Sequence, residues 1–196
     1  WYQRRVRGMT LQIVSYSNYN VTKVEELIPE PSNCGKRKPV HFEPDKHLKR
    51  DFQPSSQMGL DLQSCYLSDV RVINDLVQVS FFRPEDLIYL DLKCNKLQKL
   101  DGLEKLANLR ILYLHGNEID DVRELKKLEQ LKLDALTVHG NPLVQQTNWK
   151  FWVINQFPAL RRLDFGGITR RDRSEAEFAQ KQGLVTLKAQ PNVVWK

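Results

Sequence analysis

The sequence predicts an α/β solenoid with a short parallel sheet on its concave side and helical or 3₁₀ turns on its convex side. Three segments share the pattern LxxLxLxxNxL, and they begin at Leu87, Leu109 and Leu133. Their asparagines recur at intervals of 22 and 24 residues: Asn95, Asn117 and Asn141. This period is typical of leucine-rich repeats, in which each repeat buries its apolar face only by stacking on its neighbours.

Residues 1–58 precede the repeats and are predicted to form an extended basic arm. The stretch holds ten lysines and arginines against six acidic residues, and five prolines disfavour long helices. A short helix is expected near residues 21–27. The apolar side chains of the arm are expected to pack either on the solenoid or on a partner.

Residues 59–168 are predicted to form the solenoid and its cap. A degenerate first copy begins at Leu60 and has Cys65 in place of asparagine. Helical spacing from Val70 to Phe81 predicts an α-helix that ends before Pro84, whereas leucines at every third position in the next two connections favour 3₁₀-like or short helical turns.

The end of the solenoid is predicted from an amphipathic run and a final strand. Residues 147–157 form the run, which Thr147 or Asn148 could cap, and it is expected to close the core. A strand over residues 160–165 continues the apolar alternation and stops at Gly166 and Gly167.

Residues 169–196 are predicted to form a polar helix and an extended tail. Thr169 and Asp172 have the spacing of a capping box, so the helix is expected to begin there. It should reach about Gln182, since Gly183 favours termination.

The alternation within each repeat divides the strand residues between two faces. Leucines point to the core, and the alternate residues are predicted to form an exposed binding face. Exposed aromatic residues flanked by charges are typical of protein-binding hot spots. The predicted face consists of Asp61, Gln63, Tyr89, Asp91, Lys93, Ile111, Tyr113, His115, Ala135, Thr137, His139, Arg162 and Asp164. The alternative is a solvated face, with binding by the edges and arms.

Two further residue types are expected to shape the turns. The asparagine amides should bond backbone groups that each turn leaves unpaired. Gly116 and Gly140 are expected to supply backbone geometry at the turn.

The net charge of +6 favours acidic partners, and short basic runs are possible contacts for them. These are Lys36, Arg37, Lys38, Arg170, Arg171 and Arg173, which could equally be solvated. Runs this short make nucleic-acid binding unlikely.

No catalytic pattern emerges from the sequence. It has no nucleophile elbow, phosphate loop or HExxH motif. Asp91 and Asp164 are too far apart for an acid/base pair, and His115 with His139 lacks a third metal ligand. We therefore expect no enzyme activity, no cofactor, no metal and no small-molecule substrate.

The cellular setting is constrained only loosely. Three cysteines without CxxC spacing suggest reduced thiols and a cytoplasmic protein. We expect no membrane contact, since no apolar run is long enough to span a bilayer and no secretory signal opens the sequence.

The repeats resemble several known families. The 22-residue class is similar to phosphatase-regulating leucine-rich repeat proteins and to the spliceosomal leucine-rich A-prime protein. A closer resemblance is to the leucine-rich repeat-containing protein 51 family, through LYLHGN at residues 112–117, LTVHGNP at 136–142 and LDFGGIT at 163–169.

The resemblance implies a non-catalytic adaptor in a ciliary or flagellar axoneme, with axonemal proteins and possibly tubulin as partners. The alternatives are a regulatory subunit that binds an enzyme such as a phosphatase and a spliceosomal-type RNA–protein module.

Overall fold

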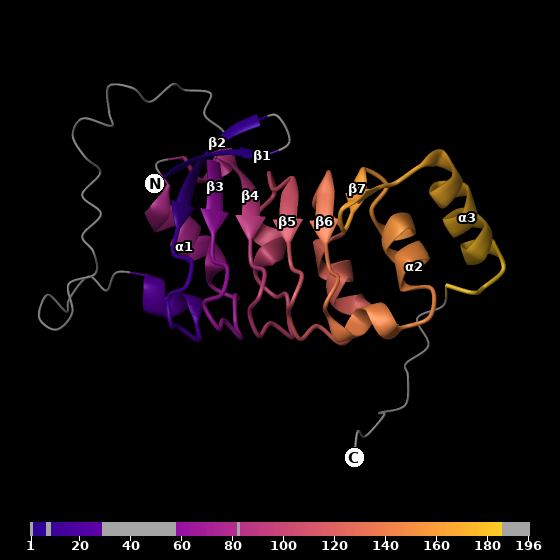
Figure 1. Ribbon diagram of the computed structural model, residues 1–196, viewed down its shortest axis with the longest axis horizontal. Helices are drawn as coiled ribbons and strands as arrows, with labels where there is room; N and C mark the ends of the chain where they lie inside the picture. The colour runs from indigo at the N-terminus through magenta and orange to yellow at the C-terminus, as the bar shows by residue number, and fades with distance from the viewer. Residues whose placement is uncertain (1, 7–8, 29–57, 82, 186–196) are drawn as a thin grey trace, which may run out of the picture.

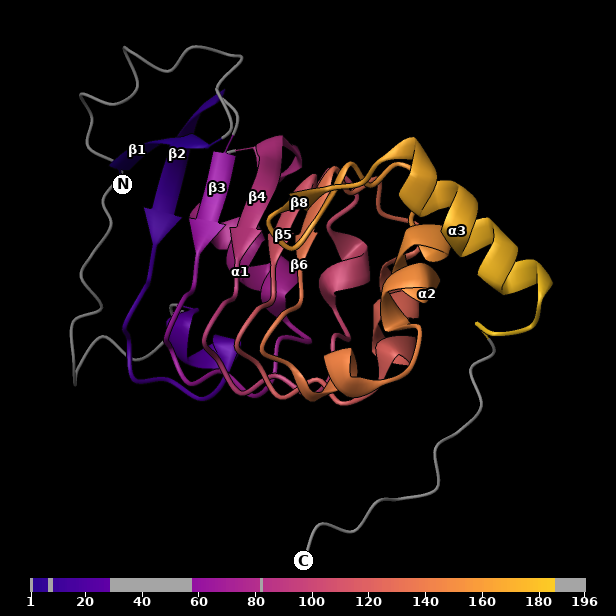
Figure 2. The same ribbon diagram turned by 45° about the vertical axis from the view of Figure 1, so that its right-hand side comes forward.

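The computed structural model describes residues 2–6, 9–28, 58–81 and 83–185. The described residues form an eight-stranded sheet whose strands follow one another in sequence order. The sheet lines the concave side of the solenoid, and the helical segments that connect its strands lie on the convex side (Figures 1 and 2). The strands are β1 (Tyr2–Val6), β2 (Met9–Ser15), β3 (Met58–Asp61), β4 (Leu87–Asp91), β5 (Ile111–Tyr113), β6 (Ala135–Thr137), β7 (Arg162–Leu163) and β8 (Gly166–Gly167). The predicted leucine-rich-repeat solenoid is confirmed.

Strands β2 to β7 are parallel, and an antiparallel hairpin stands at each end of the sheet. One apolar residue from each parallel strand lies in register with the next, and all six side chains are buried in the main core. They are Val14, Leu60, Leu90, Leu112, Leu136 and Leu163. The strand alternation therefore directs one face inward, as predicted.

The convex connections differ in helix type. The first contains the α-helix α1 (Ile73–Ser80), followed by the 3₁₀ turn η2 (Pro84–Asp86). The next two contain the 3₁₀ turns η3 (Leu103–Lys105) and η4 (Val122–Leu128), whose leucines at every third position enter the core. These predictions are confirmed.

The C-terminal end of the core is covered by two α-helices. The 3₁₀ turn η5 (Pro142–Gln145) leads to α2 (Trp149–Gln156), which packs against η4 and α3 (Arg170–Lys181). The capping box of Thr169 and Asp172 begins α3 as predicted, and its hydrogen bonds lower the pKa of Asp172 to about 2.

The predicted side-chain cap of α2 is wrong. Asn148 stands at the N-cap position, but its φ of 61° places it in the left-handed region. Its amide Nδ2 donates to the carbonyl oxygen of Leu184 at 3.0 Å instead. The side chain therefore anchors the segment after α3 rather than the first turn of α2.

The asparagine ladder joins consecutive repeats. Asn117 Oδ1 accepts from the Leu97 amide at 3.1 Å, while its Nδ2 donates to the carbonyl oxygens of Leu92 and Leu114 at 2.9 and 2.8 Å. Asn95 and Asn141 bond their own neighbours in the same way. The predicted backbone role of these amides is confirmed.

Cys65 partly reproduces this role in the degenerate repeat. Its Sγ donates to the carbonyl oxygen of Tyr16 at 3.0 Å, the direction in which Asn95 donates to Leu62. Burial raises the pKa of the Cys65 thiol, so the thiol keeps its proton for this bond.

The prediction of an extended arm over residues 1–58 is wrong for its described part. Residues 9–15 form β2, which pairs in parallel with β3, and the 3₁₀ turn η1 (Val24–Leu27) follows it. The left-handed turn position of the later repeats also recurs here. It is occupied by Asn18, Ser64, Cys94, Gly116 and Gly140, with φ between 56° and 71°.

The first strand therefore belongs to an additional repeat. Ser15 and its partner Asp61 are 46 residues apart, about twice the later intervals of 22 and 24 residues, so the period is not visible in the sequence. The remaining arm residues, 29–57, lie outside the described residues.

Candidate protein-binding face

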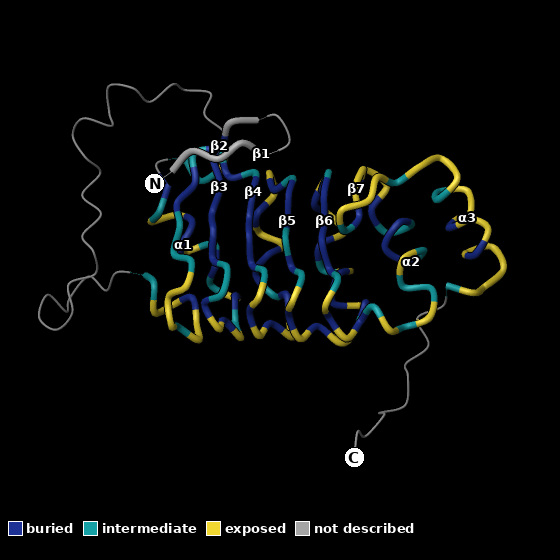
Figure 3. The backbone as a smooth tube through the Cα atoms, in the orientation of Figure 1, coloured by how far each residue is buried: buried dark blue, intermediate teal, exposed yellow. Residues whose placement is uncertain are grey.

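The upper part of the concave face is closed. Figures 1 and 2 together place β1 at the upper end of the sheet, on the side away from the helices. A second apolar cluster is buried on this side of the sheet, formed by Leu11, Ile13, Tyr89, Ile111 and Ala135. Figure 3 shows β3, β4 and β6 as largely buried.

Nearly half of the predicted binding face is therefore inaccessible. Six of its residues are buried: Asp61, Tyr89, Asp91, Ile111, Ala135 and Thr137. The prediction that they are exposed is wrong, because β2 brings Leu11 and Ile13 onto the same side and creates an apolar layer there.

Tyr89 is the largest side chain in this layer. Its ring lies over Gly59 and meets the ring of Tyr113 edge to face, with centroids 5.4 Å apart. Its hydroxyl donates to Asp91 Oδ2 at 2.9 Å. The buried phenol thus satisfies its polar group within the face.

The buried carboxylates are bound locally. Asp91 pairs with Lys93 at 3.1 Å, which offsets the charge of that lysine. Asp61 accepts from the Gln63 amide at 3.1 Å and from the Ser15 hydroxyl at 3.4 Å. These two carboxylates hold the strand ends rather than face solvent.

The lower part of the concave face is open and is lined by rings. Here we define the concave patch as Tyr113, His115, His139 and Phe165. The imidazoles of His115 and His139 are stacked, with centroids 4.5 Å apart and planes 14° from parallel. Phe165 lies 5.9 Å from His115 and 5.1 Å from His139, and it is 72% exposed.

Asp164 positions the histidine stack. Its Oδ1 accepts from the backbone amides of Val138 and His139 at 2.8 and 2.9 Å. It also lies 3.2 Å from His139 Nδ1. Since an ionised carboxylate only accepts, Nδ1 of His139 carries the hydrogen.

His115 is held by Thr137, whose Oγ1 lies 2.8 Å from its Nδ1. Partial burial lowers the pKa of His115, and the neighbouring His139 lowers it further. The ring is therefore neutral near pH 7. His115 consequently contributes an uncharged ring to the patch near pH 7.

The comparisons with known proteins fit this architecture. A family model described as the NXF1/2/3/5 leucine-rich repeat domain matches residues 49–165. Leucine-rich repeat-containing protein 51 of Mus musculus is 34% identical over 173 residues, which cover 87% of this chain and 86% of that protein. The chain belongs to the leucine-rich repeat-containing protein 51 family.

Two further similarities lie outside the leucine-rich repeat-containing protein 51 family. A probable U2 small nuclear ribonucleoprotein A' of Drosophila melanogaster is 32% identical over 126 residues, or 50% of this chain and 48% of that protein. The crystal structure of the Drosophila melanogaster SNF/U2A' complex gives a TM-score of 0.59 at 23% identity and covers 88% of this chain and 84% of that chain. The second similarity shows a shared fold. As a leucine-rich repeat protein, this family member is a protein-interaction module.

The basic residues predicted to contact an acidic partner differ in their surroundings. Arg170 is exposed, and Arg171 is exposed but pairs with Glu175 at 2.7 Å. The guanidinium of Arg173 donates to the carbonyl oxygens of Ile154 and Leu160, and its contact with an acidic partner stays a prediction. Lys36, Arg37 and Lys38 lie outside the described residues.

The sequence did not predict Phe165 as part of the binding face. Its place in the apolar alternation predicted a core position. Leu163 and Gly166 are paired, so Asp164 and Phe165 form a two-residue turn, which passes in front of β5 and β6 in Figure 2. The LDFGG sequence is the available signal, because glycines directly after a short strand indicate a tight turn.

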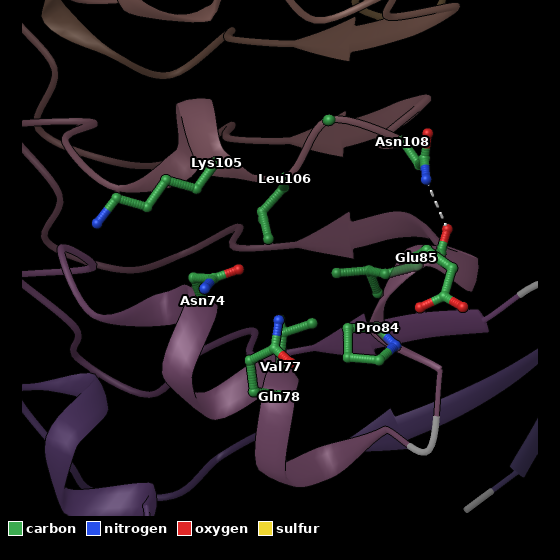
Figure 4. Close-up of a pocket in the computed structure, with 10 residues that line it drawn as sticks. Asn74, Val77, Gln78, Pro84, Glu85, Lys105, Leu106 and Asn108 are labelled. Carbon is green, nitrogen blue, oxygen red and sulfur yellow. Dashed lines mark hydrogen bonds between the residues drawn. The ribbon is translucent and has the colours of Figure 1, made fainter.

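A small pocket lies on the convex side, away from the concave patch. It separates α1 from the segment after η3, and Val77, Leu87 and Leu106 contribute its apolar lining (Figure 4). Asn108 Nδ2 donates to the carbonyl oxygen of Glu85 at 3.0 Å across its rim. The pocket arises because an α-helix in one repeat adjoins a shorter 3₁₀ turn in the next.

The described part of the chain offers neither a metal site nor a membrane span. No group of three or more histidine, cysteine or acidic side chains there could hold a metal ion. None of the helices in that part is long and apolar enough to cross a membrane.

Proposed function

We propose that this chain is a non-catalytic adaptor whose concave patch binds another protein, and that it is a fixed component of a ciliary or flagellar axonemal complex. The observation that carries the first half is the exposed Phe165 beside the stacked histidines. The family resemblance supports the second half.

The concave patch has the properties of a binding hot spot. Its rings are held by neighbouring rings and by Asp164 and Thr137, so little side-chain freedom is lost when a partner binds. An exposed aromatic side chain on such a support gains energy from burial in a partner. The surrounding strands fix the position of the concave patch.

The partners that we propose are axonemal proteins, with tubulin among them, and the location is the cytoplasm and the axoneme. The basic net charge of the chain supports contact with acidic protein surfaces. This role requires no catalytic group and no small-molecule substrate.

Extraction of isolated cilia tests the proposal. A tagged chain should remain with axonemes after washing with detergent and high salt. Phe165→Ala should release it, whereas Phe178→Ala, which removes another exposed phenylalanine from α3, should not. Release of the wild-type chain into the soluble fraction would contradict an axonemal role, and co-purification with phosphatase activity would favour a regulatory subunit.

The similarity to the Drosophila U2 A' protein favours a second candidate, an RNA–protein module. A nuclease treatment distinguishes it. Partners held through RNA should be lost after nuclease, whereas partners held by the concave patch should stay bound.

A further inference from the structure

We propose that the concave patch recognises an arginine side chain of the partner protein. Its guanidinium would lie in the corner between Phe165 and the His115–His139 stack and would pair with the Oδ2 atom of Asp164. This inference rests on the proposed function, because it specifies the chemistry of the partner at the same face.

The corner is formed by two aromatic walls. The ring planes of Phe165 and His139 are inclined by 56°, and their centroids are 5.1 Å apart. The imidazole of His115 stacks on that of His139 and so forms part of the same wall. Phe165 is mostly exposed, so the corner is open to a ligand. A planar cation can lie against such rings and be attracted by their negative faces.

The base of the corner carries a carboxylate with one unused oxygen. Oδ1 of Asp164 accepts from Val138 and His139, whereas no hydrogen bond to its Oδ2 is found among the residues that the structure describes. Within those same residues, its one ion pair is with His139, which is charged only when protonated. A partner cation would complete this pairing.

The charges around the corner are compatible with a cation. Lys93 is already bound to the buried Asp91. Arg162, which is exposed two residues before Asp164, is the opposing charge. Removing Arg162 should therefore strengthen binding, an effect that a purely apolar docking site would not show.

Arginine fits better than lysine on geometric grounds. Its guanidinium is planar, stacks on aromatic rings and offers several donors in a fixed fork. The ammonium of lysine is compact and strongly hydrated, so it gains less from ring faces. We expect arginine to be preferred by roughly fivefold over lysine.

The test is an NMR titration of the labelled full chain with three blocked tripeptides that differ only at their central residue, which is arginine, lysine or glutamate. The arginine peptide should shift the ring signals of His115, His139 and Phe165. Asp164→Asn, which keeps the Oδ1 acceptor, should weaken this binding by roughly three- to tenfold, and Arg162→Ala should strengthen it. Phe178→Ala should leave it unchanged.

Preference for the glutamate peptide would overturn the inference. The absence of shifts at about 50 mM arginine peptide, where a site of millimolar affinity would be nearly saturated, would also overturn it. If Phe165→Ala loses the axonemal partner while Asp164→Asn retains it, the adaptor function stands and the arginine chemistry fails.

Discussion

The ring of Tyr89 lies directly against Gly59 of the neighbouring strand. A Cβ atom at position 59 would stand 2.9 Å from Tyr89 Cδ1 and 3.1 Å from Ile13 Cγ1. Both side chains are fully buried, so neither can move aside freely. The absence of a side chain at residue 59 therefore allows the concave apolar layer to close.

Gly59→Ala is expected to destabilise the protein. Overpacking costs about 1–3 kcal/mol, which exceeds the 0.5–1 kcal/mol or so that alanine gains over glycine in a strand. Urea unfolding monitored by circular dichroism measures the difference. Gly167→Ala is the matched control, because its added Cβ would meet nothing within 4 Å. Equal effects at the two glycines would show that the Tyr89 contact is not tight.

Asn117→Ala should weaken the stacking of repeats. The change leaves the Leu97 amide and the carbonyls of Leu92 and Leu114 without their side-chain partners. A buried group left unpaired costs about 1–3 kcal/mol, and the loss should appear as a lower urea midpoint.

Asn108→Ala provides the comparison for Asn117→Ala. Asn108 also bonds a carbonyl, that of Glu85, but it is exposed, so water can replace the lost bond. We expect a change within about 0.5 kcal/mol there. If both asparagine variants lose the same stability, the ladder does not contribute through burial.

The fold could be predicted from the sequence because the pattern within each repeat shows which of its residues are buried. LxL with a following asparagine assigns Leu112, Leu114 and Asn117 to buried positions, and all three are buried. The first strand could not be predicted in this way. Tyr19 stands where the asparagine would, and a long insertion separates this repeat from the next.

The binding face was harder to predict, because alternation assigns a side of the sheet but not its exposure. Tyr89 and Tyr113 alternate in the same way, yet Tyr89 is buried and Tyr113 is partly accessible. The difference comes from Ile13, a residue distant in sequence that packs beside Tyr89 across Gly59. Exposure here is a tertiary property.

Arg173→Ala is expected to loosen the C-terminal cap. Arg173 joins α3 to the carbonyls of Ile154 and Leu160, which belong to α2 and the segment after it. Hydrogen bonds from a charged donor contribute about 1.5–3 kcal/mol, and hydrogen exchange of the α3 amides should report the loss.

Arg170→Ala separates this structural role from general charge. Arg170 is exposed at the first turn of α3, where a positive charge opposes the helix dipole. Its removal should leave exchange unchanged or slow it slightly. Faster exchange in both variants would show that charge, rather than the Arg173 contacts, holds the cap.

His115 should make stability depend on pH. Its pKa is lowered from 6.5, first by burial and then by His139 and Lys93, against the opposing charges of Asp91 and Asp164. The unfolded chain therefore binds a proton more readily than the folded one. The resulting stabilisation is fully present above the unfolded pKa and is lost as pH falls through 6.5 toward the folded pKa.

The comparison of wild type with His115→Gln isolates this contribution. The difference between their unfolding free energies should favour wild type more at about pH 7.5 than at about pH 5.5. In an NMR titration, His139→Gln should raise the pKa of His115, because His139 is one of the neighbours that lower that pKa. A His115 that titrates above 6.5 in the wild-type chain would contradict the stacked, partly buried arrangement and would place a protonated ring where the arginine site requires a neutral one.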